Sequence, residues 1–202
     1  MDDKKLIELA RETVICEARA VEALTSQMDE SLKNITALMM NCKGRILVAG
    51  AGTSRAVAQR YAHLLACCGT AALAINAADA LHGGAGAICA DDIVWIISKG
   101  GESQEINTFV DIARFRGARI IAQTENADSE LAKKSDVIYH IRTTGEVDPY
   151  GMIATGSSLV NSAACDVICG LLLRLRGYTK AQFGSTHPEG AVGNKLETEE
   201  EN

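Results

Sequence analysis

Glycines and hydroxyl residues stand together directly after an apolar run near the start of the chain. Residues 46–49 are apolar and partly β-branched, Gly50 and Gly52 interrupt them, and Thr53 and Ser54 follow. This order predicts a buried strand, a tight turn and the first turn of a helix. Free backbone N–H groups at a helix N-terminus attract anions, glycine lets an anion come close, and hydroxyls can add hydrogen bonds. The stretch predicts a cradle for an anion such as phosphate, but an ordinary turn without a ligand fits the same pattern.

Further hydroxyl residues follow other predicted strands. A second glycine turn, Lys99-Gly100-Gly101-Glu102-Ser103, comes after the apolar run 91–98, and a hydroxyl-rich segment opens the long apolar helix predicted for 155–176. Hydroxyls from three separate strand or loop ends strengthen the case for one shared anion site. The candidate binding residues are Gly52, Thr53, Ser54, Ser98, Gly101, Ser103, Thr155, Ser157 and Ser158.

Strand and helix patterns alternate along most of the chain. We expect strands at 46–49, 70–75, 91–98, 118–123 and 136–141, with helical segments between and after them. Such alternation predicts a parallel sheet with right-handed crossovers, and its ligands bind at the carboxyl ends of the strands. The expected fold class is α/β, a flavodoxin- or Rossmann-like three-layer sandwich around a five-stranded parallel sheet.

Two helical patterns precede the first strand, at about 3–26 and 28–40. We expect an N-terminal helical hairpin over residues 1–42, whose faces are either solvated or packed against another subunit. Residues 43–196 form the α/β core of a single domain 1–196, and the acidic residues 197–202 form a solvated tail.

Composition excludes several classes of function. The 202 residues carry a formal net charge of -6, which argues against a nucleic-acid partner. We find no signal segment and no run long and apolar enough to cross a bilayer, so we expect a cytoplasmic protein without a membrane partner.

Seven cysteines, without a CxxC motif, indicate reduced thiols and no disulfide framework. Cys165 and Cys169 share a helix face, where packing is favoured over metal binding, and we expect no metal.

The glycine turns also exclude two common nucleotide sites. A dinucleotide fold would have a third glycine where Arg55 stands and an acidic residue where Asn76 stands. The Walker phosphate loop is absent from the sequence. A small phosphorylated molecule remains as the predicted ligand.

Five segments together resemble the SIS (sugar isomerase) domain family. They read GAGTSR, ALHGGAGAI, ISKGGESQEI, GEVDPYGMIATGSS and THPEGAVGNKL. Within the family, the chain is most similar to the arabinose-5-phosphate isomerases of the KpsF/GutQ type, from about Leu32 to Leu196. Because the chain ends there, we expect a form without their regulatory CBS domains. The resemblance implies an aldose–ketose isomerase of a sugar phosphate, such as arabinose 5-phosphate and ribulose 5-phosphate, acting without a cofactor as a homo-oligomer, a tetramer or a dimer.

Matched by motif, the resemblance implies four catalytic residues. A base must move a proton between neighbouring carbons through an enediol, and Glu146 is the first candidate and Glu102 the second. His187 would open a sugar ring, and His82 would polarise the carbonyl or orient a hydroxyl. Without the resemblance, each has a structural alternative: Glu102 could cap a helix, Glu146 could be a solvated acid, and both histidines could be structural.

The chain departs from the family in its two glycine turns. Thr53 stands where the family has a lysine, and Lys99-Gly100-Gly101 replaces Asn-Ser-Gly. Lys99 and Arg55 are the two candidates to supply the missing positive charge. A non-catalytic SIS module that senses a phosphosugar, a phosphosugar lyase and a 6-phospho-3-hexuloisomerase stay open as alternatives.

Overall fold

A computed structural model describes residues 2–145 and 147–200, except the side chains of Val192 and residues 197–200. A five-stranded parallel sheet in the order β2-β1-β3-β4-β5 forms its centre. The strands are β1 Ile46–Gly50, β2 Ala72–Ala74, β3 Ile93–Ile97, β4 Arg119–Thr124 and β5 Val137–His140. Every predicted strand is therefore present within two residues of its expected limits.

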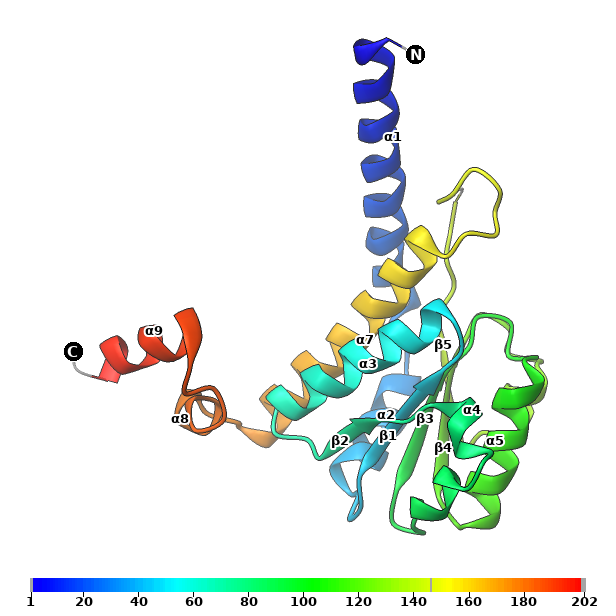
Figure 1. Cartoon of the computed structure of the whole chain (residues 1–202), viewed down its shortest axis with the longest axis vertical. Coiled ribbons are helices and arrows are strands. Elements are labelled where there is room, and N and C mark those ends of the chain that lie inside the picture. Colours follow the sequence, from blue (N-terminus) through cyan, green and yellow to red (C-terminus); the bar gives the residue numbers. More distant parts are fainter. Residues whose placement is uncertain (1, 146, 201–202) are drawn as a thin grey trace.

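Helices cover both faces of the sheet (Figure 1). Their bounds are α1 Asp3–Glu22, α2 Ser31–Met40, α3 Thr53–Cys67, α4 Ala77–Ala80, α5 Gln104–Phe115, α6 Glu130–Lys133, α7 Thr155–Arg176, α8 Lys180–Gly184 and α9 Gly190–Glu200. Two short 3₁₀ helices add Ala23–Gln27 and Gly84–Ala87. This is the expected three-layer α/β fold, and α9 runs into the predicted acidic tail as far as Glu200.

The alternation of side chains along the strands divides the core into two clusters. Ile46, Val48 and Trp95 face α2, α3 and α7, whereas Leu47 and Val94 face α4, α5 and α6. Strands buried on both faces read as continuous apolar runs, which is why β1 and β3 could be recognised in the sequence.

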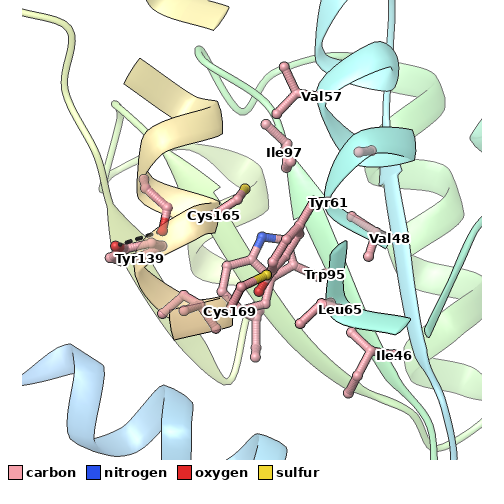
Figure 2. Packing of buried hydrophobic residues seen from close by; sticks show 14 of the residues in the cluster. Ile46, Val48, Val57, Tyr61, Leu65, Trp95, Ile97, Tyr139, Cys165 and Cys169 are labelled. Carbon is pink, nitrogen blue, oxygen red and sulfur yellow. Dashed lines mark hydrogen bonds between the residues drawn. The ribbon is translucent and has the colours of Figure 1, made fainter. Parts of the chain in front are cut away.

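Trp95 lies at the centre of the larger cluster (Figure 2). Tyr61 and Tyr139 pack against its ring edge-to-face, with ring centroids 5.1 and 6.0 Å away. Its indole N–H donates to Gln123 Oε1 at 3.1 Å, so the buried polar atom is paired.

The helix α7 is a core helix in this fold, although its length and composition alone would suit a membrane span. This corrects the expectation that no run is apolar enough for that. Val160, Ala164, Ile168 and Leu172 are fully buried in the cluster around Trp95. All seven cysteines lie in the described part of the chain, and all are unpaired.

One ion pair links the amino ends of two central strands. Asp92, just before β3, has a side chain that is 1% exposed. It accepts hydrogen bonds from the backbone N–H groups of Arg45 at 2.7 Å and Cys89 at 2.9 Å, and from the Arg45 guanidinium at 3.1 Å. Burial alone would raise the pKa of Asp92, but these donors outweigh it and lower the pKa below its usual value.

Replacing Asp92→Asn should destabilise the fold by about 2 kcal/mol near neutral pH, since it removes a charged acceptor of several donors. A carboxyl with a lowered folded-state pKa stabilises fully above its unfolded pKa of about 3.9 and loses this contribution as the pH falls further. Urea unfolding should therefore show the largest difference from wild type near neutral pH and a smaller one below about pH 4.

The neighbouring exposed Asp91→Asn is the matched control and should change stability by less than about 0.5 kcal/mol. Equal effects of the two substitutions would contradict the role given to Asp92.

Candidate functional site

A small cavity of about 50 Å³ opens at the carboxyl edge of the sheet, where β1 and β3 end. The chain leaves β1 toward β2 at one side of the sheet and leaves β3 toward β4 at the other. Such a reversal of strand order is where open α/β sheets bind ligands. The lining residues come from α3, the turn after β3, and α7: Thr53, Ser54, Val57, Lys99, Ala154, Ser157, Ser158 and Asn161.

Two glycines bring the first turn of α3 close to the end of β1. A Cβ atom on Gly50 would lie 2.7 Å from the backbone carbonyl group of Ser54, so a larger residue does not fit there. Gly52 adopts a φ of +54°, which favours glycine, and precedes the first helical residue. The predicted glycine turn therefore places Thr53 and Ser54 at the cavity.

The N-termini of two long helices meet at this cavity. Thr53 and Ser54 begin α3, and Ser157 and Ser158 lie in the first turn of α7. Each N-terminus carries unpaired backbone N–H groups and a partial positive charge. The electrostatics of the cavity therefore favour an anion.

Several hydroxyls in the cavity have no partner among the residues that the structure describes. Among the hydrogen bonds of the described residues, none uses the hydroxyl of Thr53, Ser54 or Ser157. Ser157 is only 5% exposed, but its Oγ is not among the fully buried side-chain atoms that lack a partner, so the hydroxyl reaches the surface of the cavity. Ser158 Oγ donates to the carbonyl of Thr155 at 2.8 Å and retains its acceptor capacity.

A buried amide network fixes α7 beside the cavity. Gln123 Nε2 donates to Asn161 Oδ1 at 2.8 Å and to the Asn161 carbonyl at 3.1 Å. Asn161 Nδ2 donates in turn to the Ser157 carbonyl at 2.8 Å. Sequence reasoning missed Asn161, although a polar residue four positions after Ser157 in an apolar helix was a usable signal.

Other predicted binding residues shape the loops and do not line the cavity. Ser98 Oγ accepts a hydrogen bond from the N–H of Gly101 at 3.2 Å, inside the second glycine turn. Gly101 has a φ of +70°, and a Cβ there would collide with Ser129. Ser103 precedes α5 without a side-chain cap, and Thr155 Oγ1 donates to the carbonyl of Val147 at 2.8 Å.

The structure places the acidic candidates as follows. Glu102 is exposed, and its Oε1 accepts a hydrogen bond from the N–H of Glu130 at 3.1 Å, so it caps α6, a different helix from the α5 that follows it. Glu146 lies outside the described residues. The residue after it, Val147, packs against Gly156 in α7, where any Cβ would collide with it.

The two candidate histidines, His82 and His187, do not line the cavity. His82 is exposed just after α4. The His187 ring stacks on Phe183 at 3.9 Å, and its Nε2 lies 3.5 Å from Cys67 Sγ. Cys67 and Thr53 stand at opposite ends of α3, about 20 Å apart. His187 is therefore remote from the cavity of its own chain.

The two cations left open by the sequence lie in different places. Lys99 lines the cavity. Arg55 lines a separate recess of about 140 Å³ with Gln59 and Asn76. No group of three or more His, Cys, Asp or Glu side chains suited to a metal occurs among the described residues.

Comparison with known proteins gives the same family as the motifs. The profile of the SIS domain matches residues 39–168. Arabinose 5-phosphate isomerase KpsF of Escherichia coli is 33% identical over 197 residues, which cover 97% of this chain and 62% of that protein. The chain thus spans about three fifths of the length of this curated relative.

Two solved structures share the fold over nearly the whole chain. A Listeria monocytogenes protein described as a sugar-phosphate isomerase has a TM-score of 0.90 and 33% identity, covering 94% of this chain and all of that one. An E. coli CFT073 protein in complex with arabinose 5-phosphate has a TM-score of 0.90 and 29% identity, covering 93% of this chain and all of that one. The sheet, the motifs and these matches agree, and the chain belongs to the SIS domain family.

Proposed function

We propose that this protein is a sugar-phosphate isomerase that interconverts an aldose and a ketose phosphate, of the arabinose 5-phosphate and ribulose 5-phosphate type. The observation that carries the proposal is the cavity at the carboxyl edge, beneath two helix N-termini, where the hydroxyls of Thr53, Ser54 and Ser157 bond to no described residue. A phosphate ester offers the negative charge and acceptor oxygens that such a cavity lacks. The relative with arabinose 5-phosphate bound and the KpsF isomerase support the choice of sugar.

The proposed chemistry moves one proton between neighbouring carbons. A carboxylate removes the proton from C2 of the aldose, the C–H electron pair forms the C1–C2 double bond, and the carbonyl oxygen gains a proton. The resulting enediol loses the proton of its O2 hydroxyl, and C1 receives a proton to give the ketose. Glu146 is the proposed base, because the residue that follows it is held at the first turn of α7 beside the cavity.

Glu102 remains the second candidate base, although its carboxylate caps α6 in the structure. His187 and His82 remain the proposed ring-opening and carbonyl-orienting groups. Since His187 is remote from the cavity of its own chain, we propose that it serves the cavity of a neighbouring copy. The active form is then a homo-oligomer, for which a tetramer or a dimer is proposed, and its expected location is the cytoplasm.

The surface of α1 supports an assembly of copies. This helix extends away from the rest of the chain (Figure 1), and of its residues only Ala20 is buried. Ile7, Val14, Ala18 and Val21 form one stripe along it. The stripe continues into a groove of about 650 Å³ between α1 and α7, where Leu159 is exposed.

The isomerase proposal is tested by incubating the protein with arabinose 5-phosphate in deuterated water and following the products by NMR. We expect ribulose 5-phosphate, with deuterium at the carbon next to the carbonyl. A panel of other pentose and hexulose phosphates identifies the substrate if it differs. Binding of a phosphosugar with no turnover on any of them would contradict the isomerase and favour a sensing module.

Replacing Glu146→Gln should lower kcat by about 100-fold or more, because an amide cannot accept the carbon-bound proton. The affinity for arabinose 5-phosphate, measured by calorimetry, should stay within about threefold of wild type, since the phosphate contacts remain. Glu102→Gln is the parallel variant: a larger loss of kcat there than in Glu146→Gln would transfer the role of base to Glu102.

Light scattering after gel filtration should give a mass of two or four chains for the wild type. The double variant Ile7→Glu with Val14→Glu should shift the protein toward the monomer, because it adds charge to the apolar stripe. Lys5→Glu changes the net charge by the same amount on the opposite side of α1 and should leave the mass unchanged. A monomeric wild type would contradict the assembly.

A further inference from the structure

Within the described part of the chain, the walls of the proposed phosphate cavity are neutral apart from one side chain. Thr53, Ser54, Ser157 and Ser158 offer hydroxyls, and Asn161 uses its amide within the protein. Among the described lining residues, Lys99 is the single cation. A phosphate monoester carries between one and two negative charges near neutral pH. The position of this ammonium group therefore matters for the affinity of the cavity.

The backbone of Lys99 is fixed, whereas its side chain is loosely held. The Lys99 carbonyl accepts hydrogen bonds from Thr124 Oγ1 and from the N–H of Glu125, both at 3.0 Å. The ammonium group lies 4.0 Å from Glu125 Oε1, and the Lys99 side chain is 52% exposed. An ion pair that is this long and exposed contributes little stability. The side chain can exchange this partner for a better one at small cost.

Glu125 is held more firmly, by the segment that follows β5. Its Oε1 accepts hydrogen bonds from Thr143 Oγ1 at 2.6 Å and from the N–H of Thr143 at 3.1 Å. The Glu125 carboxylate is 20% exposed. Its carboxylate is therefore held in place, 4.0 Å from the Lys99 ammonium group that lines the cavity.

The geometry points to Lys99 as the phosphate-binding cation of this chain, exchanging Glu125 for the phosphate when a phosphosugar binds. Glu125 is a positioning residue: it keeps the ammonium group beside the cavity and competes with the incoming anion for it. Arg55 does not take part, because its side chain lines the separate recess near β2. This inference rests on the proposed phosphosugar site and adds the residues that set its affinity.

The experiment measures binding, not turnover, so that it can be judged apart from the isomerase proposal. The probes are arabinose 5-phosphate, inorganic phosphate and unphosphorylated arabinose, titrated calorimetrically into the full chain. Lys99→Met should weaken arabinose 5-phosphate binding by about 10- to 100-fold, the usual range for a lost charged hydrogen bond. Lys99→Arg should stay within about threefold of wild type, and Arg55→Met should bind as the wild type does.

Glu125→Gln tests whether Glu125 competes with the phosphate for the Lys99 ammonium group or only helps to hold the loop in place. The amide keeps an oxygen for both Thr143 hydrogen bonds but no longer attracts the ammonium group, so arabinose 5-phosphate should bind about two- to fivefold more tightly. In the Lys99→Met background the same substitution should have a clearly smaller effect, because there is no ammonium group to release. Thermal melting of each variant checks that the fold is retained.

Equal affinity of wild type and Lys99→Met would overturn the inference, as would a loss in Arg55→Met of the same size. An unchanged effect of Glu125→Gln in the Lys99→Met background would overturn the exchange with Glu125. Lys99-dependent binding without isomerisation would support the inference and count against the isomerase alone. Isomerisation with a KM unaffected by Lys99→Met would support the isomerase proposal and overturn the inference about Lys99.

Discussion

A buried amide that must satisfy all its hydrogen bonds determines much of this structure. Gln123 is completely buried in β4. Leaving its amide without hydrogen bonds there would lower the free energy of unfolding by about 2–3 kcal/mol. Trp95 from β3 donates to its oxygen, and Asn161 from α7 accepts from its nitrogen. One side chain thereby joins two strands and the long helix, and a one-residue slip of α7 would leave its nitrogen without an acceptor. Because the register of α7 is fixed, the positions of Ser157 and Ser158 at the cavity are fixed too.

The cavity itself follows from the topology of the sheet. Parallel strands end at one edge, and the reversal of order between β1 and β3 leaves space there that no crossover helix covers. The glycine turn after β1, the turn after β3 and the N-terminus of α7 surround this space. Its donors are nearly all neutral hydroxyls and backbone N–H groups, which bind an anion without the desolvation cost of several buried cations.

Local sequence signals predicted the elements well and the long-range contacts poorly. The central strands β1 and β3 could be recognised because strands buried on both faces are uninterrupted apolar runs. Gly52 marked the start of α3, where the positive φ favours glycine. Three features were not predictable: the contact of Glu102 with the N-terminus of α6, the position of His187 beside Cys67, and the position of Lys99 at the cavity. Each depends on segments that only the folded chain brings together.

The pair Arg45–Asp92 lies at the amino ends of β1 and β3, and the cavity lies at their carboxyl ends. A five-residue strand is about 17 Å long, which exceeds the range over which substitutions usually influence each other. The ion pair that stabilises the fold and the cavity that determines ligand preference therefore lie at opposite edges of the sheet. Substitutions that stabilise one edge of the sheet and substitutions that change the ligand preference of the other should therefore combine additively.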